Sequence, residues 1–552
     1  MRSLSLLSGA LLLHQSLALA PTYSDSIFSP YIAEKYNRVG AAYKTASYPH
    51  VTAASGSWVW TGADWWTSGF LPGSFYLLEE RKRLCPNNKD LNSVDWLTYG
   101  RRWSDGLIKL QSGNGQGHDQ GFLALPYLDE LKINPTNASA ISGVKNFATL
   151  LANRYSSIVG CTRSWNSAAP EFQVIMDNMM NLELLFTAAD LTGNRTLIDM
   201  AISHANKTIT NHIRPDGSSY HVVAYNENTG AVIRRYTAQG YADNSTWTRG
   251  QAWGIYGFAK MFNLTTQPQY LDTARRMAKV FLTRLPSNGV PPYDYDAPAS
   301  NRPADTSAAT IAAEGLFILS AAEAYSKNAT GANYYKKQGV KLLADNFKFA
   351  FKPTWDSILS NGTSNVPQNN KNTGLVYGDY YALQAGNSML KLGLASLFIQ
   401  SKLSFGVVNL KPIVPGHVLV VPHRVVPRLS DLTPEEITDV FCLVQRVGNV
   451  VQKEYKAEGL TIACQDGPAA GQTVPHVHVH ILPRRFTDFD GNNDQVYPTL
   501  EAAETRLPNQ LRAVTGEAKV PEPIKVDDEG RTPRTVEDME AEAVRLHALF
   551  SN

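Results

Sequence analysis

Three histidines, His476, His478 and His480, stand at alternate positions in the stretch QTVPHVHVHILPRR. Strict alternation of polar and apolar residues predicts a β-strand, in which the three imidazoles share one face. Such a face could bind zinc, form a solvated surface or attack a phosphate. The preceding loop contains Gly467 and Gly471 and could aim backbone N–H groups at a phosphate, which favours nucleotidyl transfer through a covalent histidine over a metal site.

Two carboxylates earlier in the chain form a second candidate site. Asp119 lies in the glycine-bounded turn GHDQGF, and Asp177 lies in QVIMDNMMNLELL, which has the apolar spacing of a helix. The helical neighbours of Asp177, among them Gln173 and Val174, are half apolar, so we expect a raised pKa, which suits a general acid near neutral pH. A pair of carboxylates is typical of sugar hydrolysis. Either carboxylate alone is more often a helix cap or part of a solvated face.

An aromatic stretch, SWVWTGADWWTSGFLPGSFYLLEE (57–80), carries four tryptophans within nine residues. Each tryptophan has a flat apolar face and a polar edge, which suits stacking on pyranose rings. Because the four lie beside Gly, Asp and Ser, we expect a sugar-stacking loop, with a buried core as the alternative.

Helical periodicity dominates the elements that must position these residues before residue 395. It is clearest over 176–191, 251–262, 308–325 and 334–347, whereas strand-like alternation is scarce. Twelve such segments at a spacing of about 30 residues would suit an all-helical toroid with a central cavity. The C-terminal part, with its histidine strand, is different in kind.

The composition changes near residue 400 of the 552 residues, a length that itself favours two or more domains. All ten tryptophans lie before that point, and the formal net charge is +7 before it and −5 after it. We therefore predict domains over 21–397 and 398–552. Seven N-x-S/T sequons also lie before the boundary, at Asn137, Asn194, Asn206, Asn244, Asn263, Asn328 and Asn361.

Residues 1–20 have one Arg, a short apolar run and a small-residue end, which is the pattern of a signal peptide and predicts secretion. No later segment reaches about 18 consecutive apolar residues, so we predict no membrane span. A net charge of +2 gives no indication of a nucleic-acid partner, and four cysteines exclude a disulfide-built scaffold.

The motifs WTSGFLPGSFYLL, HDQGF, MDNMMNLELLF, TWTRGQAWGIYGFA, DTSAATIAAEGLF and YGDYYAL together resemble the unsaturated glucuronyl hydrolases, glycoside hydrolase family 88, over about residues 30–395. The resemblance implies an (α/α)6 barrel that acts without a cofactor on unsaturated uronide oligosaccharides. Asp177 would protonate C4 of the C4=C5 double bond and direct water to C5, and Asp119 would stabilise charge. Arg249 would bind the uronate carboxylate, and Trp253 would stack on the sugar. The related unsaturated rhamnogalacturonyl hydrolases share the fold, which leaves the substrate open.

HVHVHIL is the histidine-triad motif, and residues 399–550 resemble the Fhit-type diadenosine polyphosphate hydrolases, an α+β fold around an antiparallel sheet. By this resemblance His478 attacks the α-phosphate of a diadenosine polyphosphate, His476 and His480 assist it, and His417 supports the nucleophile. The nucleotide would be held by Asn409, Gln465, Gly471, Gln472, Thr473 and Val474. The resemblance also implies a homodimer, and Mg²⁺ would arrive with the substrate's phosphates.

Family members carry a segment before the residues that match FIQSKLSF, so this second domain looks truncated at its N-terminus, with an unpaired sheet edge. Export suits the first domain, whereas the dinucleotide substrates of the second are intracellular. The chain is therefore either a fusion of two neighbouring genes or a bifunctional protein. The histidine-triad part could also be an inactive, nucleotide-binding appendage. A barrel that only binds carbohydrate is a further alternative, which the carboxylate pair argues against.

Overall fold

The computed structural model describes residues 25–43, 46–85, 88–113, 116–392, 397–401, 403–409, 412–422, 424, 426–472, 475–504, 539, 542–543, 545–546 and 549–550. The signal-like residues 1–20, together with Thr473 and Val474, lie outside the described residues.

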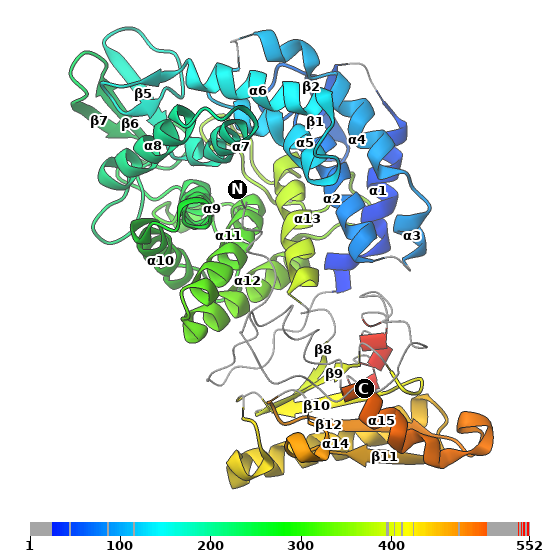
Figure 1. Cartoon of the computed structure of the whole chain (residues 1–552). Coiled ribbons are helices and arrows are strands. Elements are labelled where there is room, and N and C mark those ends of the chain that lie inside the picture. Colours follow the sequence, from blue (N-terminus) through cyan, green and yellow to red (C-terminus); the bar gives the residue numbers. More distant parts are fainter. Residues whose placement is uncertain are drawn as a thin grey trace.

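The first part of the chain is a ring of helices (Figure 1). Twelve described helices before residue 392 have ten residues or more: α1 (Pro30–Ala41), α2 (Phe70–Leu84), α4 (Trp96–Asp105), α5 (Gln120–Ile133), α6 (Ala138–Ala152), α7 (Leu182–Thr192), α8 (Thr196–His212), α9 (Thr248–Thr265), α10 (Pro268–Thr283), α11 (Thr306–Tyr325), α12 (Ala329–Ala350) and α13 (Val376–Lys391). A short α3 (Lys89–Asn92) lies between α2 and α4. The predicted all-helical barrel is confirmed.

Inner and outer helices alternate along the chain. Helices α2, α5, α9, α11 and α13 are buried over most of their length, whereas α1, α6, α8 and α10 bury one face. A helix that is apolar on all sides belongs in a core, and an amphipathic helix belongs on its outside. The inner ring therefore forms the wall of the barrel. Helix α11 is apolar and long enough to span a membrane, but 89% of its apolar window is buried within the protein.

Three small antiparallel sheets interrupt the helices, which the scarcity of alternating residues did not predict. Their strands are β1 (Ser47–Thr52) with β2 (Trp58–Gly62), β3 (Tyr155–Ser156) with β4 (Cys161–Thr162), and β5 (Glu171–Ile175) with β6 (Val222–Asn226) and β7 (Val232–Tyr236). The expected helix over 176–191 is also divided, into a 3₁₀-helix (Met176–Asn181) and α7. Gln173 and Val174 lie in β5, so the helical environment predicted for Asp177 was wrong: a strand leads directly into its turn.

The C-terminal part is a five-stranded antiparallel sheet in the order β11-β12-β10-β9-β8. Its elements are β8 (Leu397–Gln400), β9 (Ser404–Val408), β10 (Val418–Pro422), α14 (Pro434–Glu454), β11 (Gly459–Ala463), β12 (Val479–Arg484) and α15 (Val496–Glu504). In this order β8 and β11 are outer strands, each with one side unpaired among the described residues. Apolar residues of α14, including Val440 and Val447, pack on the sheet.

Separate hydrophobic cores support the two parts. The barrel core extends from Ile27 to Leu390, and the core of the C-terminal sheet begins at Ile399 and shares no residue with it. Cys85 and Cys161 are both buried, and neither belongs to a disulfide bridge.

Candidate active sites

Asp177 lies at the second position of the 3₁₀-helix that follows β5, and only 8% of the residue is exposed. Burial raises the pKa of Asp177 to about 6, because the ionised form loses its hydration, and the positive charge of Arg249 opposes this shift. Its Oδ2 has no hydrogen-bond partner among the described residues. The raised pKa that the sequence suggested is thus present, although the strand and turn that cause it differ from the predicted helix.

Asp119 immediately precedes α5, so its backbone forms the N-terminal cap of that helix. Burial and the negative charge of Asp177 together raise its pKa well above the usual range for a carboxyl. The structure therefore brings the two predicted carboxylates into one electrostatically coupled site. Near neutral pH the two coupled carboxyls together carry less than two full negative charges.

His118 is buried beside Asp119, with its Nε2 3.5 Å from Oδ1 of that carboxylate. The backbone N–H of Gly121 donates to Asn181 Oδ1 (2.7 Å), which turns the Asn181 NH2 group toward His118 Nδ1 (3.2 Å). Since Nδ1 accepts this bond, the proton of the neutral ring lies on Nε2, which faces Asp119. Burial lowers the pKa of His118 to about 3, so the ring acts as a neutral donor. The sequence left the role of His118 open.

Arg249 lies in the first turn of α9 and is 2% exposed. Its Nη1 donates to Asp305 Oδ2 (2.8 Å) and to the carbonyl of Thr363 (2.5 Å), and its Nη2 donates to Gln239 Oε1 (2.9 Å) and to the carbonyl of Ser364 (2.6 Å). These bonds engage the fork predicted to bind a uronate carboxylate. In this conformation Arg249 holds the loop after residue 360 and supplies positive charge to Asp177. Direct contact of Arg249 with the uronate carboxylate of a substrate stays a prediction.

Trp253 follows Arg249 by one turn of α9 and is fully buried. Its ring packs against Phe122 (centroid distance 5.6 Å) and Tyr381 (5.3 Å), so the predicted stacking on a sugar is not supported. The Nε1–H makes no hydrogen bond among the described residues, but the indole lies near enough to lower the pKa of Asp177. Its contribution is to the carboxyl rather than to a sugar face.

The four tryptophans of residues 57–80 do not form one wall. Trp58 and Trp60 lie on β2, and Trp60 stacks on Trp103 with a centroid distance of 6.0 Å. Trp66 packs into the core, whereas Trp65 is 45% exposed. The expectation of a single stacking loop was wrong, because two of the tryptophans lie on a strand and a third packs against the core, which leaves Trp65 as the exposed one of the four.

His221 was missed by the sequence reasoning. Its Nε2 lies 3.9 Å from Asp177 Oδ2 and has no hydrogen-bond partner among the described residues. The backbone N–H of Ala238 donates to its Nδ1 (3.2 Å), so the proton of the neutral ring lies on Nε2 and faces the carboxyl. Burial lowers its pKa well below the usual range. Nothing in the local sequence SYHVVAY marks it, since its meaning depends on Asp177, 44 positions away in the chain.

His478 lies just before β12, which begins at Val479 and not at His476 as predicted. Its Nδ1 lies 2.7 Å from the carbonyl oxygen of His476, which can only accept, so Nδ1 carries the proton. The lone pair of the neutral ring is then on Nε2. This is the tautomer that a nucleophilic histidine needs.

A chain of donors fixes the proton of His480. The backbone N–H of Ile413 donates to His417 Nδ1 (3.2 Å), so the His417 proton lies on Nε2, which is 2.9 Å from His480 Nδ1. His480 therefore carries its own proton on Nε2. Asn409 also contacts His417, at 3.2 Å. The prediction that His417 supports the nucleophile needs correction, because its bond is to His480.

His476 donates from Nε2 to the carbonyl of Pro422 (3.0 Å), which holds it against the end of β10. Its ring is thus engaged with the backbone, whereas the rings of His478 and His480 lie close together, with centroids 5.1 Å apart. Of the three predicted imidazoles, His478 and His480 lie together, and His476 is bound to the backbone of β10.

The loop before the histidines is closed on itself. Gly467 and Gly471 both have positive φ, and the N–H groups of Gly471 and Gln472 donate to the carbonyls of Pro468 and Gly467. These two N–H groups do not point outward, so the expectation that they bind phosphate was wrong. The Gln472 side chain bridges Gly467 N and the carbonyl of Pro427.

Gln465 is the polar side chain of this loop that is available to a ligand. It is 9% exposed, and its Oε1 has no hydrogen-bond partner among the described residues. A Cβ at Gly471 would approach its Nε2 to 2.7 Å, so only glycine leaves room for it there. Across the described ranges no three His, Cys, Asp or Glu side chains form a group able to hold a metal ion.

Comparison with known proteins assigns the two parts. The unsaturated glucuronyl hydrolase of Formosa agariphila is 36% identical over 327 residues, which cover 58% of this chain and 78% of that protein. The crystal structure of an unsaturated glucuronyl hydrolase specific for heparin aligns with a TM-score of 0.59 at 28% identity, over 66% of this chain and 95% of that one.

The chain belongs to the unsaturated glucuronyl hydrolase family. It also carries a HIT domain, the family that matches residues 394–487. An asymmetrical bis(5'-nucleosyl)-tetraphosphatase of Schizosaccharomyces pombe is 48% identical over 164 residues, which cover 28% of this chain and 90% of that protein. In the structure β8 pairs with β9 as an outer strand of this domain, and the truncation at its N-terminus stays a prediction. Both parts of this unsaturated glucuronyl hydrolase family member are hydrolases.

Proposed function

We propose that the barrel adds water across the C4=C5 double bond of the terminal unsaturated uronic acid of an oligosaccharide. The observation that carries this proposal is Asp177, a buried carboxyl with a pKa of about 6 whose Oδ2 faces the unpartnered Nε2 of His221. A vinyl ether needs a proton donor at one carbon and water at the next, and a half-protonated carboxyl can serve both.

In the proposed reaction, Asp177 gives its proton to C4, and C5 acquires positive charge. The carboxylate that remains takes a proton from a water molecule, whose oxygen bonds to C5. Asp119, when ionised, stabilises the charge at C5, and His118 holds Asp119 through its Nε2–H. The resulting hemiketal opens, and the leaving sugar is released. His221 places its Nε2–H 3.9 Å from Asp177 Oδ2, where it faces the carboxyl.

The direct test is loss of the ultraviolet absorbance of the conjugated double bond when purified protein is added to the products of polysaccharide lyases. Unsaturated glucuronides and unsaturated rhamnogalacturonides should be compared side by side, because both substrate classes fit an (α/α)6 barrel of this kind. Absence of turnover on every unsaturated uronide would contradict the proposal.

For the HIT domain we propose hydrolysis of dinucleoside polyphosphates through a nucleotidyl-histidine on His478. Support comes from the proton positions: Nε2 of His478 has the lone pair, and Nε2–H of His480 is a donor beside it. Asn409 and Gln465 would contact the nucleotide, and Mg²⁺ would enter with the phosphates. Trapping of a phosphoramidate at His478, detected by mass spectrometry after an acid-free quench, tests this. Binding of nucleotide without a trapped intermediate would favour the inactive appendage.

We further propose that the HIT domain dimerises through an outer strand. The unpaired side of β11 and the exposure of Ile462 (48%) support an edge contact. Light scattering of the intact chain tests it. The signal-like residues 1–20 and the seven sequons support export of the chain, and cell fractionation of the native host tests that expectation.

A further inference from the structure

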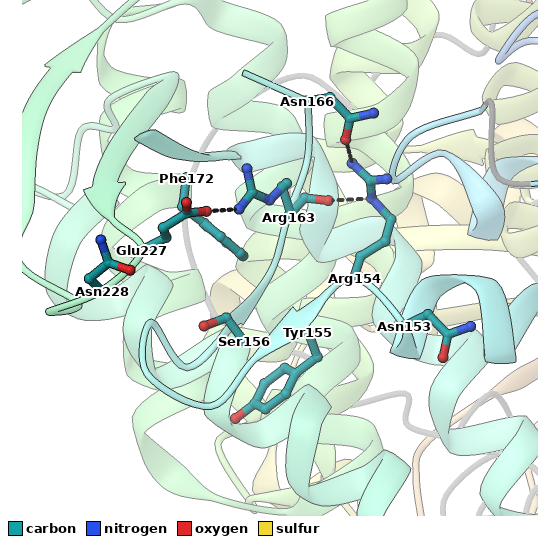
Figure 2. Close-up of a pocket in the computed structure, with 9 residues that line it drawn as sticks. All are labelled: Asn153, Arg154, Tyr155, Ser156, Arg163, Asn166, Phe172, Glu227 and Asn228. Atoms are coloured by element: carbon teal, nitrogen blue, oxygen red, sulfur yellow. Dashed lines mark hydrogen bonds and ion pairs between the residues drawn. The ribbon is translucent and has the colours of Figure 1, made fainter. Parts of the chain in front are cut away.

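Away from the carboxylate site, a polar cavity of about 480 Å³ lies at the C-terminal end of α6, where the short β3–β4 hairpin meets the turn between β6 and β7 (Figure 2). Its walls are mostly amide, guanidinium, carboxylate and hydroxyl groups, with the rings of Tyr155 and Phe172 among them. Apolar ligands need mostly apolar walls. A cavity with both donors and acceptors and an aromatic ring instead suits a sugar.

Arg154 forms one wall of this cavity. Its Nε donates to the carbonyl of Arg163 (2.7 Å), and its Nη2 donates to the carbonyl of Ser164 (3.1 Å) and to Asn166 Oδ1 (3.0 Å), as Figure 2 shows in part. Its Nη1 has no hydrogen-bond partner among the residues that the structure describes. No carboxylate pairs with it within 4 Å in the same part of the chain. Arg154 therefore brings an uncompensated positive charge and two available N–H donors to the cavity.

The other charges of the cavity cancel. Arg163 pairs with Glu227, and its guanidinium also lies over the ring of Phe172 at 4.4 Å (Figure 2). The net charge of the walls is thus that of Arg154 alone. A ligand that matches them is a polar sugar with one anionic substituent, because the guanidinium binds carboxylate and sulfate alike.

Residues 163–166 contact both Arg154 of the cavity and residues that lie beside the catalytic carboxylates. Arg154 fastens this segment from the cavity side through the bonds above. On the catalytic side, Trp165 packs edge-on against His221 (6.0 Å), and a Cβ at Gly117, beside the Asp119 turn, would meet the Ser164 carbonyl at 3.1 Å. The charge of Arg154 also reaches Asp119 and lowers its pKa. Segment 163–166 therefore connects the cavity walls with the surroundings of the two carboxylates.

We propose that this cavity is a distal subsite that binds an anionic sugar on the leaving side of the substrate. The proposal rests on the proposed function of the barrel and deepens it, since it assigns the substrate class: acidic oligosaccharides longer than a disaccharide. Arg154 binds the carboxylate or sulfate, and the amide side chains bind hydroxyl groups.

Two variants test the subsite. Asn228→Trp fills the cavity from an exposed turn, where the Asn228 side chain makes no hydrogen bond to any residue that the structure describes. Arg154→Gln removes the charge. Arg195→Gln, at an exposed position before α8, is the matched control for loss of one arginine. The kcat and KM values are measured on an unsaturated disaccharide and on unsaturated tetrasaccharides whose leaving sugars are neutral, carboxylated or sulfated.

Asn228→Trp should raise KM at least about tenfold on an anionic tetrasaccharide and less than about twofold on the disaccharide, with Arg195→Gln unchanged. Arg154→Gln, whose charge also reaches Asp119, should raise KM at least about tenfold more on the anionic tetrasaccharide than on the disaccharide. The tetrasaccharide on which KM rises more, carboxylated or sulfated, identifies the anionic group that the cavity binds. Equal losses on both chain lengths would overturn the proposal, because they would show that the variants act only through Asp119. No loss on any substrate would overturn it as well.

Calorimetry with a saturated acidic tetrasaccharide separates this proposal from the proposed reaction, because binding needs no double bond. Binding to the intact chain that Asn228→Trp weakens about tenfold supports the subsite even if no unsaturated substrate is turned over. Absence of binding, or equal binding to wild type and Asn228→Trp, overturns it.

Discussion

The barrel assembles its reactive groups from distant segments, whereas the HIT domain takes its two reactive imidazoles from one short stretch. Asp119 precedes α5, Asp177 follows β5, and His221 precedes β6. His478 and His480 are two residues apart. The barrel can therefore change the environment of each group independently, by altering a different loop. The histidine pair is constrained together, since any shift of β12 moves both rings.

The two sites also differ in what sets their protonation. Burial and neighbouring charges raise the pKa values of the barrel carboxyls, so their state changes with pH. In the HIT domain, backbone groups that can only donate or only accept fix which nitrogen carries the proton. We infer that pH tunes the first activity more directly, and that hydrogen-bond geometry controls the second.

The largest expected effect separates the two activities entirely. His478→Ala removes the covalent nucleophile and should reduce hydrolysis of diadenosine triphosphate by roughly 10⁵–10⁶-fold, the size seen when a covalent hydrolase loses its nucleophile. Hydration of uronides should be unchanged, because the two cores share no residue. Phosphate release and loss of ultraviolet absorbance measure the two reactions on one preparation. A matching loss of both would show that the parts are coupled.

Asp177→Asn should lower uronide turnover by about 10²–10⁴-fold, the usual contribution of a general acid. The change is nearly isosteric, and nucleotide hydrolysis on the same sample serves as the control. Wild-type turnover in the variant would remove Asp177 from the role of acid.

The same variant should change stability in a pH-dependent way. Because the folded-state pKa of Asp177 is raised to about 6, folding favours its neutral form, and that contribution is lost as pH rises through 6. Asp177→Asn should therefore raise the free energy of unfolding by about 3 kcal/mol at pH 8 and leave it unchanged at pH 3. Tryptophan fluorescence follows the barrel selectively, since all ten tryptophans precede residue 400. A constant difference at both pH values would contradict the assigned shift.

Arg249→Ala should destabilise the barrel by about 3–5 kcal/mol, because it leaves the buried Asp305 carboxylate without its partner. Substrate binding then fails along with the fold, and not alone as the resemblance suggested. The double variant Arg249→Ala/Asp305→Ala should recover part of the loss, since both charges leave together. Denaturant unfolding measures both, and an undiminished midpoint in the single variant would argue for a purely substrate-binding arginine.

The smallest expected effect is a shift of the pH profile. Uronide turnover should fall above about pH 6 as Asp177 ionises, and Trp253→Phe should move that limb to higher pH, because the indole N–H lowers the pKa of Asp177. The alkaline limb of the pH profile of kcat/KM for uronides measures this shift, while the pH profile of nucleotide hydrolysis should be unchanged. A limb that moves to lower pH, or stays in place, would exclude the indole from the electrostatics of the acid.

The sequence alone predicted what depends on local pattern. Helical periodicity identified the elements over 251–262, 308–325 and 334–347, and alternation identified a strand at the histidines. It failed for β6, which is buried on both sides and lacks alternation, and for β5, whose alternation covers only the four residues 171–174. The 3₁₀-helix at Asp177 has the same apolar spacing as an α-helix, so the sequence predicted one continuous helix there.

Site residues followed the same rule. Asp119 and Asp177 stood out by a glycine-bounded turn and a half-apolar helical pattern, and the family motifs around them then gave them roles, whereas His221 has no such motif. The occupied fork of Arg249 and the buried ring of Trp253 depend on contacts with residues as distant as Asp305 and Tyr381. Residue type indicated the chemistry that each group is capable of, but only the packing shows which partners it already has.

Two polar atoms beside each other in the barrel, Asp177 Oδ2 and His221 Nε2, have no hydrogen-bond partner among the described residues, and a suitable saccharide can complete their hydrogen bonds. A ligand bound only by the folded state adds about 2.7 kcal/mol to the free energy of unfolding at a hundred times its Kd, and it therefore raises the unfolding midpoint. Libraries of saturated, unreactive uronides can therefore be ranked by thermal shift in tryptophan fluorescence. The polysaccharide that this enzyme meets in nature could be recognised in this way before any turnover is observed.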